Sequence, residues 1–148
     1  MGHVAVFPDF YSHTLGHNRT LRIYTPNAYD YDPQARFGVL YMHDGQNVFN
    51  HAASARFETW CANDVVERLA WEGRIAPWIV VGIDHGHGRF EEYSPWPEAR
   101  LGVVPDGERY AHFVVQEVKP FIDAHYRTLP GPETTAVAGA SLGGLMSL

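Results

Sequence analysis

Residues 134–144 read TTAVAGASLGG, and they are the most informative part of this sequence. An apolar run typical of a strand leads into the pattern G-x-S-x-G, and residues 142–148 then have the composition of a helix start. In that context the central serine lies on a tight turn with strained backbone angles, which presents its hydroxyl as a nucleophile. Gly139 and Gly143 must be small because side chains there would collide with the turn. The pattern therefore predicts Ser141 as a nucleophile, with a chance match in a glycine-rich turn as the alternative.

Two further apolar runs precede this one, at residues 37–42 and 78–83. Neither alternates between apolar and polar residues, which is typical of strands covered on both faces, as in a parallel sheet. His-Asp-Gly follows the first run at residues 43–45, and Asp-His-Gly-His-Gly follows the second at residues 84–88. Because the chemistry of open α/β sheets lies at the carboxyl ends of the strands, we expect these segments and Ser141 to share one edge.

The segments between these runs have helical periodicity. One predicted apolar face comprises Phe57, Trp60, Cys61, Val65 and Leu69, and a second comprises Tyr110, Phe113, Val114, Val118, Phe121 and Ile122. Asp106 is the expected N-cap of the second helix, and Pro120 predicts a kink or break within residues 116–119 because it removes a backbone donor. The large side chains of Phe57, Trp60 and Trp71 are expected to pack in the core. Alternating strands and helices predict an α/β fold with right-handed crossovers.

The N-terminal part of the chain has a different pattern. Residues 4–10 and 21–25 predict two strands, and the second alternates so that Arg22 and Tyr24 lie on a solvent-exposed face. Residues 29–33 are rich in turn-forming side chains and predict a loop.

Composition narrows the class of protein. The chain has 148 residues, 45% hydrophobic and 19% charged, which predicts a single compact unit rather than a disordered chain. Eleven Lys and Arg against 17 Asp and Glu give a net charge of −6, so neither nucleic acid nor an anionic membrane is an expected partner. We find no apolar run of transmembrane length and no leader pattern, so the expected location is cytoplasmic. Cys61 is the only cysteine, which excludes an intrachain disulfide and a thiolate metal site.

The chain resembles the esterase D or enterochelin-esterase-like branch of the α/β-hydrolases, and the motifs that carry the resemblance occur in family order along nearly the whole chain. They are residues 15–19 and 24–26, 41–47, the helix around Trp60, 78–84, 89–95, 118–123 and 139–144. The resemblance implies a three-layer α/β-hydrolase sheet and a serine hydrolase of small carboxylic esters. It implies Ser141 as the nucleophile, with the backbone amides of Gln46 and Leu142 forming the oxyanion hole.

The same resemblance implies catalytic residues that this sequence does not contain. In the family an acidic residue and then a histidine follow the nucleophile, whereas this sequence stops at Leu148. A serine hydroxyl is a weak nucleophile without a base, so this chain alone is expected to be inactive. We therefore expect residues 1–148 to form one partial domain, truncated after the nucleophile turn. We also expect a missing C-terminal segment, or a second copy of the chain, to cover the edge of the strand at 134–138.

Four residues are candidates for substrate binding. The resemblance places Asp44 at the site, while Arg89, Tyr93 and Trp96 lie in a loop that either lines a pocket or merely anchors itself. Gly45 allows a sharp bend that turns the backbone amide of Gln46 toward the serine. The alternative interpretation of these residues is a plain Asp-Gly turn without a role in the site.

Several alternatives stay open at this point. His43, His85 and His87, with Asp44 and Asp84 beside them, are alternatives for a replacement triad, and His85 and His87 with His43 or Asp44 are alternatives for a metal site. No third metal ligand is fixed by the spacing, and neither role is favoured. We expect no metal and no cofactor, and the glycine patterns do not form a dinucleotide or Walker motif. The function is then an esterase, a related acyltransferase, or a non-catalytic half-domain that binds a ligand or protein.

Overall fold

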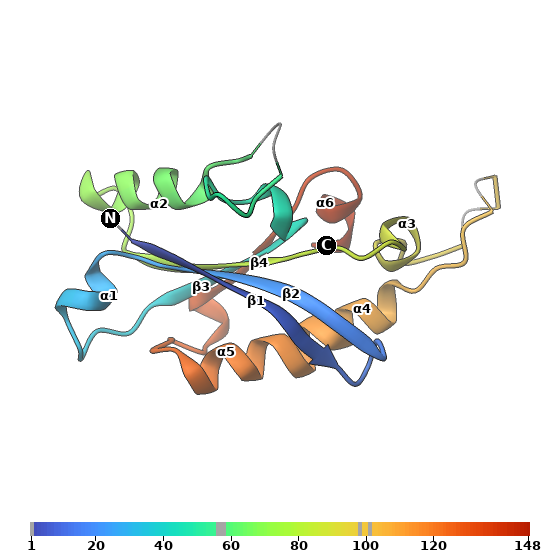
Figure 1. Ribbon diagram of the computed structural model, residues 1–148, viewed down its shortest axis with the longest axis horizontal. Helices are drawn as coiled ribbons and strands as arrows, with labels where there is room; N and C mark the ends of the chain where they lie inside the picture. Colours follow the sequence, from blue (N-terminus) through green and yellow to red (C-terminus); the bar gives the residue numbers. More distant parts are fainter. Residues whose placement is uncertain (1, 56–58, 98, 101) are drawn as a thin grey trace.

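The computed structural model describes residues 2–55, 59–97, 99–100 and 102–148, and its centre is a mixed five-stranded sheet with strand order β1-β2-β4-β3-β5 (Figure 1). The strands are β1 (His3–Ser12), β2 (His17–Thr25), β3 (Gly38–His43), β4 (Trp78–Ile83) and β5 (Thr135–Ala138). β1 and β2 form an antiparallel hairpin, and β2 is antiparallel to β4. β3 is parallel to both β4 and β5, which confirms the α/β class and the parallel arrangement of the three apolar runs.

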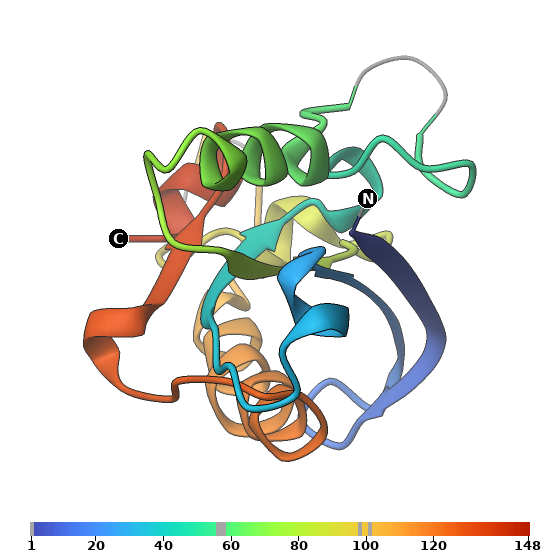
Figure 2. The same ribbon diagram turned by 90° about the vertical axis from the view of Figure 1, so that its left-hand side faces the viewer.

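Helices cover both faces of this sheet. The α-helices are α1 (Ala28–Tyr31), α2 (Ala62–Trp71), α3 (Arg89–Glu92), α4 (Gly107–Phe113), α5 (Lys119–His125) and α6 (Leu142–Met146). A π-helical turn, η2 (Val114–Val118), joins α4 to α5, and short 3₁₀ turns lie at η1 (Gly45–Asn47) and η3 (Pro132–Thr134). Figure 2 shows α2 on one face of the sheet and the α4–η2–α5 segment on the other.

The two faces explain why the apolar runs do not alternate. Val39 and Tyr41 of β3 pack into the core cluster beneath α4 and α5, whereas Met42 packs with Val48 and Ala62 beneath α2. Successive side chains of a strand point to opposite faces, so a strand covered on both sides must be apolar at every position.

The prediction for the helix at α2 is wrong about where the helix starts and about which of its side chains face the sheet. Cys61 has φ 49°, so the regular helix begins only at Ala62, and that residue and Val66 pack against the sheet instead of Val65. Trp60 and Trp71 are 56% and 90% exposed, which corrects their expected place in the core. Phe57 lies outside the described residues. Periodicity alone did not locate the left-handed residue that sets where the helix starts.

Two further N-terminal predictions need correction. Part of the predicted loop at residues 29–33 belongs to helix α1. Arg22 and Tyr24 are only 7% and 1% exposed, so the second face of β2 is buried rather than wet. It is buried because Arg22 pairs with Asp84 at the end of β4 and Tyr24 packs against Phe49.

The long helical segment behaves largely as predicted. Asp106 occupies the N-cap position of α4, although its side chain makes no capping hydrogen bond. The regular pattern breaks over Val114–Val118, just before Pro120, and the π-turn accommodates the missing donor. Among the described residues, none of the helices combines the length and hydropathy needed to cross a bilayer.

Candidate active site

Ser141 lies in a strained turn between β5 and α6. Its backbone has φ 55° and ψ −122°, a region that non-glycine residues rarely adopt, and the residue is exposed. A Cβ built on Gly139 would lie 2.5 Å from the carbonyl carbon of Gly143, and one on Gly143 would lie 3.2 Å from His43 Cβ. Both glycines are therefore needed. A side chain on Gly139 would collide with the other side of the turn, as predicted, whereas one on Gly143 would crowd His43 of β3.

The start of α6 provides one amide beside this serine. The Gly143 N–H donates to the Ala140 carbonyl at 2.9 Å, and the Leu145 N–H donates to the Ser141 carbonyl at 3.0 Å. Leu142 is the first residue of the helix, where the amide has no carbonyl acceptor within the helix. Its N–H is thus suited to stabilise negative charge at the serine, as the sequence suggests.

The turn after β3 is built differently from the prediction. Asp44, not Gly45, takes the left-handed conformation, with φ 57° and ψ 49°. Gly45 is required for close packing instead, because a Cβ there would lie 2.7 Å from the backbone of Gly82 and 2.6 Å from Asp84 Oδ1. The 3₁₀ turn uses the Asn47 and Val48 amides, which donate to Asp44 and Gly45. Gln46 lies at the start of this turn, where amides lack partners within the helix.

Helix α3 holds Asp44 in place. Arg89 Nε and Nη2 donate to the two carboxylate oxygens of Asp44 at 2.7 and 2.8 Å, a bidentate pair in which both side chains are largely buried. This hydrogen bonding raises the pKa of Arg89. The Asp44 backbone N–H also donates to the Tyr93 hydroxyl at 3.1 Å. Three of the four predicted binding residues are therefore brought together, but they bind one another.

The candidate binding residues differ in how deeply they are buried. Tyr93 is fully buried, and desolvation raises the pKa of its hydroxyl to about 12. Its ring packs 5.0 Å from Tyr110 and 5.4 Å from His43, measured between ring centroids. Trp96, the fourth candidate, is 58% exposed on the loop after α3.

His43 lies in the core behind the serine turn. Its Nδ1 is 2.8 Å from the Tyr110 hydroxyl, and burial lowers the pKa of the imidazole to about 4 although Asp44 opposes the shift. Among the described residues, no histidine or carboxylate forms a hydrogen bond with the Ser141 hydroxyl. This arrangement gives the replacement triad no support.

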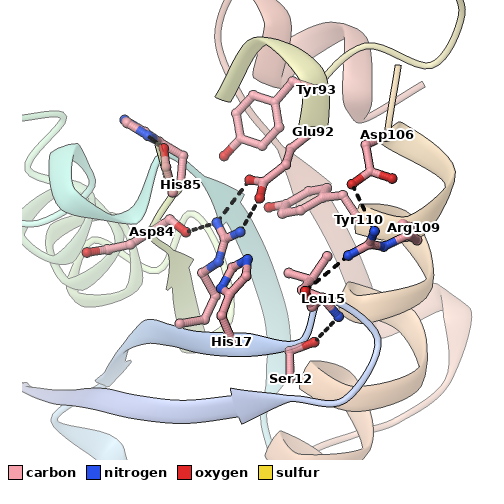
Figure 3. Close-up of polar contacts among 12 residues, drawn as sticks. Ser12, Leu15, His17, Asp84, His85, Glu92, Tyr93, Asp106, Arg109 and Tyr110 are labelled. Carbon is pink, nitrogen blue, oxygen red and sulfur yellow. Dashed lines mark hydrogen bonds and ion pairs between the residues drawn. The ribbon is translucent and has the colours of Figure 1, made fainter. Parts of the chain in front are cut away.

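A buried charge network that the sequence analysis missed braces the neighbouring strand ends (Figure 3). Arg19 Nη1 donates to Glu92 Oε2 at 3.0 Å and to the Asp84 carbonyl at 3.2 Å, and its Nη2 also pairs with Glu92. Arg22 Nε and Nη2 donate to the carboxylate of Asp84 at 2.7 and 2.8 Å. Arginines on a strand beside apolar residues are a sign of buried ion pairs, but their acidic partners lie more than sixty positions away in the sequence. Within the described part of the chain, no three His, Cys, Asp or Glu residues are grouped to hold a metal ion.

A family model described as "Putative esterase" matches residues 12–148. The uncharacterized protein YbbA of Bacillus subtilis (strain 168) is 26% identical over 136 residues, which are 88% of this chain and 50% of YbbA.

Solved structures are similar in fold. An IroE-like serine hydrolase from Shewanella oneidensis superposes with a TM-score of 0.72 at 22% identity, covering 99% of this chain and 44% of that one. The enterobactin esterase FES from Shigella flexneri gives 0.72 at 20% identity, covering all of this chain and 32% of that one. The chain thus spans half or less of the length of these proteins.

Proposed function

Since the chain belongs to the family described as Putative esterase, we propose that it forms the nucleophile-bearing part of a serine hydrolase of small carboxylic esters. In this proposal Ser141 Oγ attacks the ester carbonyl carbon, and the backbone amides of Gln46 and Leu142 stabilise the oxyanion that forms. The C–O bond to the alcohol then breaks, the alcohol leaves with a proton, and water hydrolyses the acyl-enzyme. None of these steps requires a cofactor.

The observation that carries the proposal is the serine turn itself. Ser141 is exposed on a strained backbone between a strand and a helix, and the first amide of that helix adjoins it. The turn lies against the end of β3, because a Gly143 Cβ would lie 3.4 Å from Asp44 Oδ2. The contact between α6 and the end of β3 supports the proposal that amides from both segments face the hydroxyl of Ser141, as acyl transfer needs.

A base must still activate the serine. We propose that the acid and the histidine of the triad lie outside residues 1–148, and that these residues form one part of a single α/β-hydrolase domain. The relatives support this proposal, since this chain covers 50% of YbbA and 44% of the IroE-like hydrolase. Within the described residues His43 is unsuited to the task, because it is buried and bonded to Tyr110.

The same proposal implies that a further segment packs beside β5. Among the described residues β5 pairs only with β3, and Val137 is 44% exposed on it. An apolar cavity of about 250 Å³ adjoins this strand, lined by Val114, Val115 and Met146 among others. We propose that the segment that carries the acid and the base packs here, because an apolar edge strand favours pairing with a further strand.

The test compares residues 1–148 with the longer polypeptide that contains the proposed segment. The longer form should hydrolyse p-nitrophenyl acetate, and Ser141→Ala should abolish hydrolysis. Ser147→Ala is the matched control at the C-cap of α6, since its hydroxyl donates to the Gly143 carbonyl at 2.8 Å. Activity that survives Ser141→Ala would overturn the proposal.

A further inference from the structure

Tyr93 is a buried side chain to which the reaction proposed above gives no role. It is the C-cap residue of α3, and it is 0% exposed. A side chain with no exposed surface does not contact a substrate, so its position has another purpose than lining a pocket. Its hydroxyl accepts the backbone N–H of Asp44 at 3.1 Å, a contact between residues 49 positions apart. Tyr93 therefore acts on the turn after β3.

The backbone of Asp44 needs support from outside its own turn. Its φ of 57° and ψ of 49° are left-handed, a conformation that costs free energy for a residue with a side chain. Aspartate tolerates this conformation best when its carboxylate bonds to nearby backbone, but here the carboxylate binds Arg89. Helix α3 and its C-cap thus provide both partners, Arg89 for the carboxylate and Tyr93 for the amide. The conformation that they hold sets the direction of the Gln46 amide, two residues further on.

Tyr93 also lies against the serine turn. A Cβ built on Gly143, the second residue of α6, would lie 3.8 Å from Cε2 of Tyr93, which is an ordinary van der Waals separation. The ring therefore packs beside the start of α6 while its hydroxyl bonds to the turn after β3. One side chain contacts both of the segments to which the proposed function assigns an oxyanion-hole amide.

The ring of Tyr93 is itself held firmly. Its centroid lies 5.0 Å from that of Tyr110 and 5.4 Å from that of His43. Figure 3 shows Tyr93 and Tyr110 side by side, one from the end of α3 and the other from α4. The preceding residue, Glu92, is anchored to β2 by its buried ion pair with Arg19. A hydroxyl on such a support is preorganised, as donors and their supports must be to stabilise a developing charge.

We propose that Tyr93 is a positioning residue of the oxyanion hole: its hydroxyl holds the Asp44 amide and so keeps the Gln46 amide directed at the oxygen of the tetrahedral intermediate. The inference rests on the proposed esterase function and extends it to a residue that contacts neither the substrate nor the nucleophile. No bond to Tyr93 forms or breaks. Because the oxyanion exists only after Ser141 has attacked, the contribution of Tyr93 falls on the transition state and not on substrate binding.

The kinetic test is Tyr93→Phe in the longer polypeptide, with p-nitrophenyl acetate as substrate. The substitution keeps the ring and removes only the acceptor of the Asp44 N–H. We expect kcat to fall about tenfold with little change in KM, a smaller loss than the roughly 100–1,000-fold that follows removal of an oxyanion donor. Tyr29→Phe is the matched control, because the Tyr29 hydroxyl also accepts a backbone N–H, that of Arg127 at 3.3 Å, but on α1 at the other end of the sheet (Figure 1). An unchanged kcat in Tyr93→Phe would overturn the inference.

A tetrahedral adduct separates positioning from a general loss of stability. A trifluoromethyl ketone accepts Ser141 Oγ at its carbonyl carbon, and the former carbonyl oxygen becomes an oxyanion in the hole. Its inhibition constant should rise in Tyr93→Phe by the same factor by which kcat/KM falls, and it should stay unchanged in Tyr29→Phe. An unchanged inhibition constant alongside a lowered kcat would refute a role through the oxyanion hole.

Amide resonances separate this inference from the esterase proposal. In the Tyr93→Phe variant of the longer polypeptide, the ¹H–¹⁵N resonances of Asp44 and Gln46 should shift, and the Asp44 amide should lose protection against hydrogen exchange. Tyr29→Phe should leave both unchanged. If these changes occur but the parent hydrolyses no ester, the positioning contact stands and the esterase proposal fails. If the parent hydrolyses the ester and the Gln46 resonance does not respond, the esterase proposal stands and the role of Tyr93 is refuted.

Discussion

His43 should make the stability of the protein depend on pH in a defined window. Burial lowers the pKa of its imidazole from 6.5 to about 4 in the folded protein. Between these values the unfolded chain binds a proton that the folded protein does not, so stability falls as pH falls from about 6.5 to about 4. Each tenfold difference in proton affinity corresponds to about 1.4 kcal/mol, so the window is worth about 3 kcal/mol.

The assay is urea unfolding of the parent and of His43→Asn at several pH values across this window. The variant has no imidazole, so its free energy of unfolding should fall less with acidification, by about 3 kcal/mol over the window. Contributions from carboxylates are common to both proteins and cancel in the difference. Parallel pH profiles, or an NMR titration of His43 with a midpoint near its ordinary value, would refute the reasoning.

Three other substitutions test the packing and charge of the site. Gly139→Ala should destabilise the fold by about 1–3 kcal/mol in thermal unfolding, whereas Gly88→Ala, whose Cβ would meet only one atom at 3.5 Å, should have little effect. Glu92→Gln should cost about 3 kcal/mol because it leaves a buried arginine unpaired, while Glu72→Gln in an exposed pair should cost less than about 0.5 kcal/mol in the same assay. In the longer polypeptide, Arg89→Gln should lower kcat about tenfold with little change in KM, since it releases the turn after β3; a raised KM with unchanged kcat would instead indicate that Arg89 binds substrate.

The parallel strands could be predicted because each buried strand is a run of consecutive apolar residues. The apolar run at residues 78–83 coincides with β4, since a strand covered on both faces must be apolar at each position. The serine turn was equally accessible, because Gly139 is required by the backbone of Gly143 within the same turn, although Gly143 itself is required by contacts with the distant His43 and Asp44. Local sequence therefore determined the strand, the turn and their order.

Side-chain partners could not be predicted, because they depend on long-range geometry. Asp44 and Arg89 are both candidates for substrate binding in the sequence, and only the position of α3 relative to β3 shows that they bind each other. Arg22 alternates like a surface residue, yet it is buried because Asp84, just past the end of β4, pairs with it. Trp71 fits the size of a core residue, but the helix turns it to the outside.

The most direct test of the account is a crystal structure of the longer polypeptide after reaction with a fluorophosphonate. We predict phosphorus bonded to Ser141 Oγ, with the phosphoryl oxygen about 2.7–3.1 Å from the backbone nitrogens of both Gln46 and Leu142. An adduct on another residue, or a phosphoryl oxygen directed away from these two amides, would contradict it.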